Sequence, residues 1–271
     1  MDNKDHIKIR KNDRETLFER LSRYIFESLH NYRTFGIYRS YWWFRGRKEL
    51  ILALLASFKL PRHILCLDAG CGTGDDLGGL EQYGKFLAID FSRKAVSQIP
   101  ENRMQADIIQ LPLASEAFDL IICLDVLEHI QEHEKAVKEL TRVLKTGGYI
   151  VFSVPAHPFL YSTHDRFLGH VRRYSRKSFL RLFSGIKLKR VRLTHWNFFA
   201  FLPIAIIRII RKVVFWQIQG RPLSDIDKLP YGLNWILFRL LRLENFLIMK
   251  INICLPWGTS LFGIFRKEHA E

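Results

Sequence analysis

The sequence has few of the residues that would cross-link or export a chain. Only four cysteines occur among 271 residues, and none forms a C-x-x-C pair. This count argues against a disulfide framework and against a cysteine zinc site. The first ten residues, MDNKDHIKIR, contain no apolar core, so a secretory signal is not expected. We therefore predict a reduced, cytoplasmic protein.

Long uncharged apolar runs are also scarce. The run Trp196–Ile207 covers twelve residues and contains Pro203, and the cations Arg208, Arg211 and Lys212 follow it closely. A transmembrane helix needs about 20 largely uncharged residues. The sequence therefore predicts no membrane span at this run.

Acidic residues are scarce in one part of the chain only. Residues 1–165 contain 22 Lys and Arg against 22 Asp and Glu, whereas residues 166–271 contain 20 against 5. The formal net charge of +15 therefore lies entirely in the last 106 residues. Such an asymmetry predicts a polyanionic partner, either nucleic acid or an anionic membrane surface.

The chain is organised around the sequence LCLDAGCGTGD, which begins at Leu65. The apolar run Ile64–Leu67 has no polar alternation and is typical of a strand buried on both faces of a parallel sheet. Three glycines then follow at alternate positions, where they allow a sharp turn and close approach to a ligand. Asp90 ends the next apolar run, 20 residues after Gly70. At this spacing a carboxylate reaches ribose hydroxyls in nucleotide-binding α/β folds.

The segments after this loop form an ordered series. They are Met104–Ile108, the strand-like Phe118–Asp125 that leads into Val-Leu-Glu-His129, and Leu144–Val154 with its Gly-Gly turn. In this order and spacing the series resembles the class I S-adenosylmethionine-dependent methyltransferases, over about residues 62–155. In motif it is most similar to the ubiquinone-biosynthesis O-methyltransferase branch.

The resemblance implies a fold and a cofactor. The expected fold is α/β: a Rossmann-like seven-stranded sheet with N-terminal lid helices and a helical insertion before the last strand. The expected cofactor is S-adenosylmethionine, with S-adenosylhomocysteine as product. In the family's pattern Asp90 accepts both ribose hydroxyls and Phe91 flanks the adenine. The residues that the resemblance places at the cofactor are Asp68, Gly70, Gly72, Asp90, Phe91, Asp107, Ile108 and Asp125.

The segment Asp125–His129, DVLEH, leaves two interpretations open. In the first, Glu128 and His129 begin a helix and support the cofactor loop. In the second, the acids and His129 join a later histidine around a divalent cation. That pattern is similar to the ExxEH motif of metal-dependent RNA 2′-O-methyltransferases, although the first acid here is Asp. We assign no metal ion from the sequence.

An aromatic run precedes the first strand. Tyr41 and Trp42 begin four consecutive aromatic residues, and Arg45 follows them. In related methyltransferases the corresponding segment covers the cofactor. The resemblance therefore implies an arm and lid in residues 1–60, with these three side chains at the substrate. The alternative is an aromatic anchor that packs the helix Lys48–Phe58 onto the sheet.

A dense polar stretch, Tyr161–Ser175, follows the fifth strand. Methyl transfer is an in-line displacement, so the protein must place the acceptor and remove its proton. An imidazole with a pKa near neutrality suits that removal. We predict His164 or His170 as the general base, with Asp165 as its partner. The alternative is a structural loop held by its own salt bridges.

Other side chains near this stretch are predicted to contact the substrate. Arg172 and Arg173 could bind a phosphate or carboxylate. Tyr174 and His129 complete the predicted substrate-binding set.

The C-terminal part is predicted as a strand, an insertion and a final strand. Ile186–Leu193 alternates apolar and basic residues, and Gly258–Lys267 should pair antiparallel beside it. The predicted divisions are residues 1–60 (arm and lid), 61–195 (cofactor-binding domain), 196–256 (insertion) and 257–271 (last strand). The insertion interleaves aromatic and aliphatic residues with Lys and Arg, which is typical of helices lying in the headgroup plane. A cap packed on the domain or on a second subunit is the alternative.

The combined prediction is a methyltransferase at the inner face of the membrane. Its acceptor would be an amphiphilic or lipid-linked small molecule, such as an isoprenoid, a quinone precursor or a lipid-linked sugar, methylated at oxygen. An RNA methyltransferase is the enzymatic alternative, with the aromatic run as a stacking platform. A membrane-docked protein that kept the fold without catalysis is the other. The sequence does not predict the oligomeric state.

Overall fold

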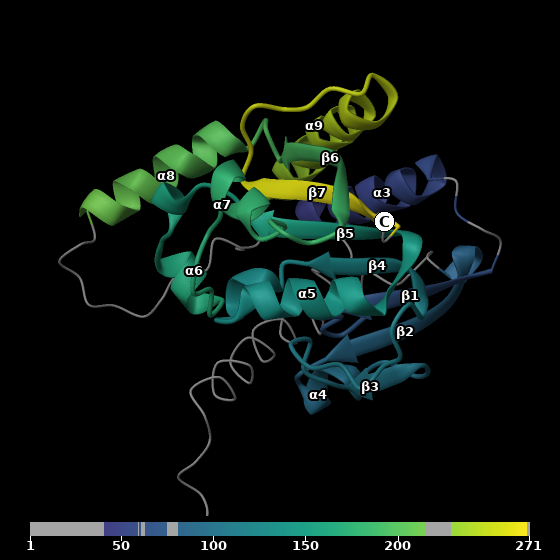
Figure 1. Cartoon of the computed structure of the whole chain (residues 1–271). Coiled ribbons are helices and arrows are strands. Elements are labelled where there is room, and N and C mark those ends of the chain that lie inside the picture. The colour runs from purple at the N-terminus through teal and green to yellow at the C-terminus, as the bar shows by residue number, and fades with distance from the viewer. Residues whose placement is uncertain (1–40, 59, 61–62, 75–80, 215–228, 270–271) are drawn as a thin grey trace, which may run out of the picture.

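The computed structural model describes residues 41–58, 60, 63–74, 81–214 and 229–269 (Figure 1). Most of the predicted N-terminal arm therefore lies outside the described residues. One seven-stranded sheet runs through the molecule in the order β3-β2-β1-β4-β5-β7-β6. Its strands are β1 (Ile64–Ala69), β2 (Gly84–Asp90), β3 (Arg103–Gln105), β4 (Phe118–Leu124), β5 (Leu144–Pro155), β6 (Leu188–Trp196) and β7 (Ser260–Lys267).

The pairing confirms the predicted Rossmann-like sheet. Strands β1 to β5 pair in parallel, whereas β7 is antiparallel to both β5 and β6. The last two strands therefore pair as the alternating pattern predicted. The strand order reverses between β1 and β4, and open α/β sheets bind ligands beyond the carboxyl ends of their strands at such a point. The sheet thus positions a site where β1, β2, β4 and β5 end.

Helices cover both faces of the sheet (Figure 1). One apolar cluster joins the strands to α5 (His133–Val143) and α7 (Arg176–Arg181), and a second joins them to α3 (Trp42–Ser57) and α9 (Tyr231–Lys250). The shorter elements are α4 (Arg93–Val96), α6 (Thr163–Phe167), η1 (Glu81–Tyr83), η2 (Leu127–His129) and η3 (Pro158–Leu160). The remaining helix, α8 (Phe201–Val214), follows β6.

Helix α3 begins six residues before the predicted helix start at Lys48. Its first residues are held by packing: the Trp43 ring lies 5.6 Å from the Trp196 ring, centroid to centroid. Trp42 and Phe44 are buried in the cluster shared with α9. The aromatic run is thus the first turn of a helix, because burial of its rings outweighs the modest helix propensity of aromatic residues.

The insertion is joined to the domain by buried polar groups. The carboxylate of Glu244 on α9 accepts hydrogen bonds from the backbone amides of Asn197 (2.6 Å) and Phe198 (2.9 Å). Asn245 accepts from the Trp196 indole at 2.9 Å and donates to the Gly46 carbonyl at 2.8 Å. These bonds fix α9 against α3 and against the end of β6. In the described part of the chain, no helix is both long and apolar enough to span a bilayer.

Candidate cofactor and catalytic site

The glycine loop turns sharply after β1. The amides of Gly70 and Cys71 both donate to the Ile89 carbonyl, at 2.8 and 2.9 Å. Gly70 has a φ of +82°, and a Cβ there would lie 2.3 Å from a methyl carbon of Val126. Gly72 has a φ of +53°, but a Cβ there would meet no atom of the described residues within 4 Å. The loop is therefore packed at its first glycine and open at its second, where a ligand could approach the backbone.

Asp90 stands at the end of β2, facing this loop. Its carboxylate accepts hydrogen bonds from the amides of Gly72 (2.9 Å) and Ser92 (2.8 Å). Burial raises the pKa of Asp90, and these two bonds oppose the rise. Each carboxylate oxygen can accept a further hydrogen bond. Asp90 thus combines an anchored position with spare acceptor capacity.

The other predicted cofactor residues gather at the same edge of the sheet. Asp68 is buried near the end of β1, and Phe91 lies partly exposed just after β2. After β3, Asp107 is exposed and accepts from the Ile109 amide at 3.1 Å, while Ile108 is buried. An acid beside an apolar residue is therefore present at the position that the resemblance assigns to the adenine edge.

Asp125, the last of the predicted cofactor residues, is engaged by the protein itself. Its carboxylate accepts from Arg47 of α3 at 2.5 Å and from the Ser153 hydroxyl at 2.9 Å. Arg47 was not among the predicted site residues, and its guanidinium also lies over the Trp43 ring, 4.6 Å from its centroid. The charge pair fixes α3 above the end of β4.

Two elements bring a buried acid and two histidines together. Glu128 and His129 come from η2, and His170 comes from the segment after α6. The Nε2 atom of His170 lies 3.8 Å from a Glu128 oxygen, and the two imidazole centroids lie 4.8 Å apart. Burial raises the pKa of Glu128 far above its ordinary value, and the nearby charge of Asp125 adds to this. Burial and His170 lower the pKa of His129 to about 3.

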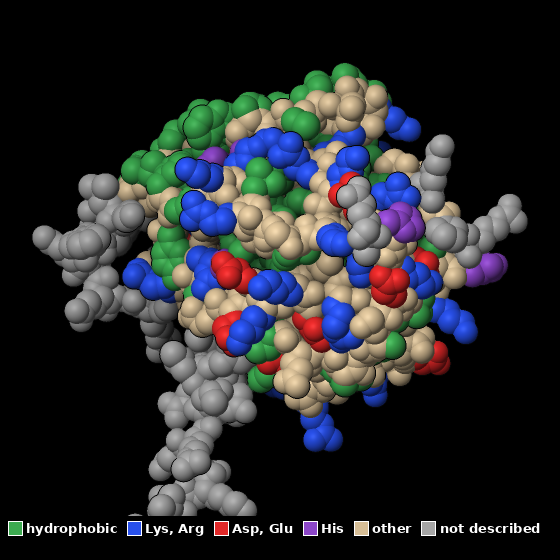
Figure 2. All heavy atoms as spheres, viewed as in Figure 1, with side chains coloured by type: hydrophobic (Ala, Val, Ile, Leu, Met, Phe, Trp, Pro, Cys, Tyr) green, Lys and Arg blue, Asp and Glu red, His purple; other side chains and the backbone are tan. Residues whose placement is uncertain are grey.

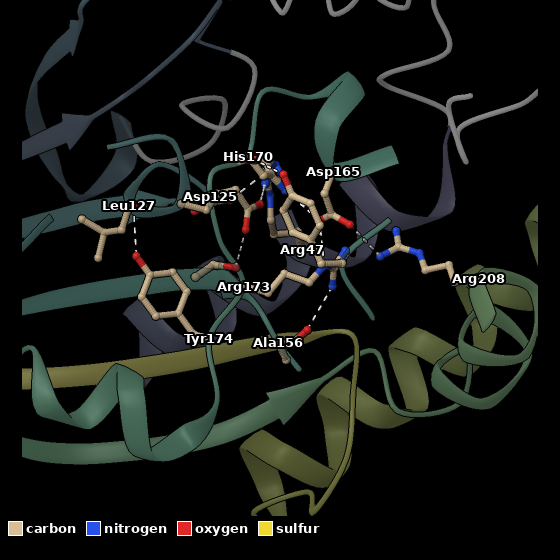
Figure 3. Close-up of polar contacts among 12 residues, drawn as sticks. Arg47, Asp125, Leu127, Ala156, Asp165, His170, Arg173, Tyr174 and Arg208 are labelled. Carbon is tan, nitrogen blue, oxygen red and sulfur yellow. Dashed lines mark hydrogen bonds and ion pairs between the residues drawn. The ribbon is translucent and has the colours of Figure 1, made fainter. Parts of the chain in front are cut away.

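Asp165 on α6 is the charged centre of this region (Figure 3). Its buried carboxylate lies 3.0 Å from Nδ1 of His170, accepts from Nε of Arg173 at 2.7 Å and lies 3.6 Å from Nη1 of Arg208. Burial alone would raise its pKa. The bond from His170 and the charges of Arg173 and Arg208 outweigh that effect and hold the pKa of Asp165 well below its usual range.

The predicted pairing of a histidine with Asp165 is thus present for His170. His164, the other candidate base, is buried one residue before Asp165 in α6. The stretch was predicted as a loop, but Thr163–Phe167 is helical because Ser162 and Asp165 form a capping box. The salt bridges of Asp165 also fit the structural alternative, so the catalytic role of either histidine stays a prediction.

The two predicted anion-binding arginines are placed differently. Arg173 is buried and also donates to the Ala156 carbonyl at 3.0 Å. Arg172 is half-exposed and donates to the Gln131 carbonyl at 3.3 Å. Tyr174 is buried, and its hydroxyl donates to the Leu127 carbonyl at 3.0 Å. Of these three side chains, Arg172 is the most open to a substrate.

The three residues predicted for the lid also differ in exposure. Tyr41 and Trp42 are buried, and the Trp42 amide donates to the Asn234 side chain at 2.9 Å. Arg45 is exposed and stacks on the Phe238 ring, 3.7 Å from its centroid. These contacts agree with the aromatic-anchor interpretation, and a contact with substrate stays a prediction.

Helix α8 supplies Arg208, a second residue that the sequence analysis did not place at the site. It was counted among cations expected to face a membrane. The structure turns it inward instead, where it is buried, contacts Asp165 and donates to the Leu160 carbonyl at 3.5 Å. The buried Arg208 therefore fixes one face of α8 against the domain.

Comparisons with known proteins agree with this geometry. A methyltransferase-domain family model matches residues 67–152. The ubiquinone/menaquinone biosynthesis C-methyltransferase UbiE of Syntrophotalea carbinolica is 31% identical over 175 residues, 59% of this chain and 69% of that protein. The malonyl-[acyl-carrier protein] O-methyltransferase of Buchnera aphidicola is 34% identical over 141 residues, 50% of this chain and 57% of that protein.

Solved structures show the same fold. A SAM-dependent methyltransferase of Thermotoga maritima superposes with a TM-score of 0.57 at 15% identity, covering 92% of this chain and all of that one. The chain spans about half the length of several of the curated relatives that it matches. The relatives named above have different acceptors, so the matched region identifies the cofactor-binding fold and not the acceptor. The match to UbiE, the family model, the glycine loop and the seven-stranded sheet together establish that this chain belongs to the class I S-adenosylmethionine-dependent methyltransferases.

Proposed function

We propose that this chain transfers a methyl group from S-adenosylmethionine to a hydroxyl of an amphiphilic or lipid-linked acceptor, at the anionic inner face of a membrane. The observation that carries the proposal is the orientation of α8. Its inward Arg208 contacts Asp165 in the candidate site, while the exposed side chains described in residues 201–210 of the helix are apolar. The helix thus connects an apolar surface with the region where an acceptor would react.

The residues at the strand ends fit the cofactor. When bound, S-adenosylmethionine supplies an electrophilic methyl group on a sulfonium sulfur. The open backbone at Gly72 admits a ligand, and Asp90 beside it offers acceptors for ribose hydroxyls. The apolar surface of Ile108 and Phe91 suits a flat aromatic base. No residue at these positions opposes the assignment that the family implies.

His170 is the group that we place at the acceptor. Its Nδ1 atom is bonded to the Asp165 carboxylate at 3.0 Å, which favours the tautomer with the proton on Nδ1. That tautomer leaves the Nε2 lone pair available to act on a hydroxyl. Tyr161 donates to the His170 carbonyl at 2.7 Å and helps to fix the segment. An orientation held from both sides lowers the entropic cost of the reactive arrangement.

The outward faces of α8 form an apolar surface. Leu202 is 64% exposed, Ile206 47%, Ile207 48% and Ile210 53%. Green side chains gather along the upper rim of Figure 2, where α8 and α9 lie. Contiguous exposed aliphatic side chains on a helix mark an interaction surface with a protein or a membrane.

Helix α9 extends the apolar surface and adds cations. Trp235 and Phe246 are each about half-exposed, at 48% and 53%, and Arg239 lies over the Trp235 ring, 5.2 Å from its centroid. Lys250 is exposed at the end of the helix. Apolar insertion combined with roughly 1 kcal/mol for each cation near an anionic leaflet describes interfacial binding. The basic C-terminal composition therefore supports a membrane over a neutral protein surface.

The activities named for two relatives agree with an amphiphilic acceptor without selecting one. UbiE acts in ubiquinone and menaquinone biosynthesis, and the Buchnera aphidicola enzyme methylates a malonyl group on acyl-carrier protein. Methylation at oxygen is favoured for this chain because an imidazole paired with a carboxylate suits removal of a hydroxyl proton.

The test is methyl transfer from S-adenosylmethionine with a labelled methyl group. The purified chain is incubated separately with a bacterial lipid extract, with total RNA and with soluble metabolites. We expect label in the solvent-extractable lipid fraction, with none from an Asp90→Ala variant that lacks the ribose acceptor. Label confined to RNA would support the nucleic-acid alternative. Cofactor binding without transfer to any fraction would support the non-catalytic alternative.

A further inference from the structure

Three possible ligand groups converge beside the proposed acceptor position. Glu128 and His129 from η2 and His170 from the segment after α6 each offer one ligand atom, and all these atoms lie within 4.8 Å of one another. The two segments are also joined through the backbone, because the Val171 amide donates to the Glu128 carbonyl at 2.9 Å. Convergence from two segments gives the cluster a fixed geometry.

Three polar atoms of Glu128 and His129 are buried without a hydrogen-bond partner among the described residues. Glu128 is 0% exposed, and neither of its carboxylate oxygens has a hydrogen-bond partner in the described part of the chain. Within the same residues, the buried Nδ1 atom of His129 has no hydrogen-bond partner either. Nearly all buried polar groups in folded proteins are bonded to protein, water or an ion, because an isolated one costs about 1–3 kcal/mol and a charged one more. A bound ion would supply the partner that the described residues do not give these atoms.

His170 carries the partner typical of a metal-binding histidine. Its Nδ1 atom is bonded to the Asp165 carboxylate, which Arg173 holds in turn. Its Nε2 atom points to Glu128 at 3.8 Å. A carboxylate on the far nitrogen orients a ligating imidazole and raises its basicity. The position of Asp165 thus fixes which nitrogen of His170 faces the cluster.

From these contacts we infer that Glu128, His129 and His170 bind one divalent transition-metal ion. Two imidazole nitrogens and one carboxylate favour zinc or a similar ion over magnesium or calcium. Tetrahedral ligands about 2.0–2.1 Å from zinc lie roughly 3.4 Å apart, so small inward rotations of these side chains would bring their ligand atoms to that spacing. Asp125 is outside the ligand set, because Arg47 and Ser153 occupy its carboxylate.

Three protein ligands leave a fourth position open. The role of the ion in catalysis rests on the proposed function. An acceptor hydroxyl bound at the open position would lose its proton to water more readily, because the cation stabilises the oxyanion that forms. With an ion bound, the Nε2 lone pair of His170 would be a ligand, so the cation would replace the free imidazole of the proposed function as the group that favours loss of the acceptor proton.

The experiment is calorimetric titration of the full-length protein with zinc chloride after chelation and dialysis. Four variants are compared with the wild type: Glu128→Gln, His129→Gln, His170→Gln and the control His63→Asn. His63 is exposed before β1 and has a φ of +61°, which asparagine tolerates. Cobalt absorption spectra and the rise in Tm on adding zinc provide two further readouts.

We expect one zinc ion per chain in the wild type and in His63→Asn. Each of the three ligand variants should bind at least about 100-fold more weakly, with no tetrahedral cobalt spectrum and no zinc-dependent rise in Tm. A magnesium titration should give no comparable binding. The inference is overturned if folded wild-type protein binds no stoichiometric zinc, or if Glu128→Gln and His170→Gln keep wild-type affinity.

The same samples separate this inference from the proposed function. S-adenosylhomocysteine binding is measured with and without zinc, and we expect it to be independent of the ion. Loss of zinc binding in the ligand variants together with retained cofactor binding supports the site. Absence of cofactor binding in every sample would count against the proposed function, whereas the zinc titrations would still test the metal site.

Discussion

Arg172 and Arg173 are adjacent in sequence, but one is half-exposed and the other is buried. Substituting each in turn therefore compares the same change in two environments. The Arg173 side chain is 4% exposed, with its Nε bonded to Asp165 at 2.7 Å and its Nη1 bonded to the Ala156 carbonyl at 3.0 Å. Arg172 is half-exposed and donates to the carbonyl and side-chain oxygens of Gln131. We predict that Arg173→Met and Arg172→Met differ strongly in their effect on stability.

The magnitude follows from what Arg173→Met leaves behind. The Asp165 carboxylate stays buried and loses its shortest charged contact, and removal of one partner of a buried ion pair costs about 3–5 kcal/mol. Typical unfolding free energies are about 5–15 kcal/mol, so a large part of the stability is lost. The expected fall in Tm is roughly 6–20 °C at about 2–4 °C per kcal/mol. Arg172→Met should cost less than about 0.5 kcal/mol.

Urea unfolding followed by circular dichroism measures both variants, with the wild type as reference. Equal losses for the two substitutions, or a cost below about 1 kcal/mol for Arg173→Met, would refute the assignment of a buried charge cluster. A triple variant, Asp165→Leu with Arg173→Met and Arg208→Met, should recover part of the loss, because apolar replacement of a whole buried charge cluster is often neutral.

Acid pH offers an independent measurement on the same cluster. The pKa of Asp165 lies below its usual range, so its ion pairs stabilise the fold above about pH 3.9, the ordinary value. That contribution is lost as the pH falls through the lowered pKa. Arg173→Met removes one cause of the lowering, so the unfolding free energy of the variant should fall less steeply in acid. If the unfolding free energy of the variant fell with pH as steeply as that of the wild type, the assignment of a buried ion pair between Asp165 and Arg173 would be contradicted.

Three further predictions concern other parts of the chain. Gly72→Ala should change the unfolding free energy by no more than about 1–2 kcal/mol but weaken S-adenosylhomocysteine binding at least about tenfold. Gly70→Ala should instead destabilise the fold, because its Cβ would lie 2.3 Å from Val126. Calorimetric titration measures the loss of binding, and thermal unfolding measures the loss of stability. Burial raises the pKa of Glu244 to about 7. Ionisation of Glu244 should therefore lower the free energy of unfolding as the pH rises from about 4.5 to 7. Urea unfolding of Glu244→Gln should show a pH dependence of the unfolding free energy that is smaller by up to about 3 kcal/mol. Of the four cysteines only Cys254 is exposed, so Ellman's reagent should titrate one thiol per native chain, and rapid labelling of a second would show that a core strand opens.

The sheet could be predicted because its signals are local and repeated. The uninterrupted apolar run that ends at Leu67 and the three glycines after it fit one strand and one turn, and the acid at Asp90 fits the end of the next strand. The strands paired as this pattern predicts, including the antiparallel end of the sheet. Each of these features depends on a few neighbouring residues, so sequence alone carries it.

The charge contacts at the site could not be predicted, because they join residues far apart in sequence. Arg47 meets Asp125 across 78 residues, and Arg208 reaches Asp165 from α8. An arginine in a basic, apolar segment is usually solvated, so composition assigned Arg208 to the surface. Arg208 faces inward because of the side on which α8 packs against the domain, and tertiary contacts decide which side that is.

The boundaries of the insertion were also set by tertiary contacts. Trp196 was assigned to the insertion but ends β6, where Asn245 accepts from its indole. Asn197 then adopts a φ of +65° and donates its amide to Glu244, which separates the strand from α8. The apolar run across this break looks continuous in sequence. The break depends on a carboxylate 47 residues away, which no local pattern reveals.

The most direct test of the membrane proposal is co-sedimentation of the full-length protein with neutral and anionic vesicles. Deletion of the whole insertion would remove α9, which packs on α3, so point variants are preferable. Ile206→Ser with Ile210→Ser alters the exposed α8 face, and Val191→Ser, 51% exposed on β6, is the matched control. We predict binding to anionic vesicles by the wild type and the control, and loss of binding by the α8 variant. Folded wild-type protein that stays in the supernatant, or an α8 variant that binds equally well, would contradict the proposal.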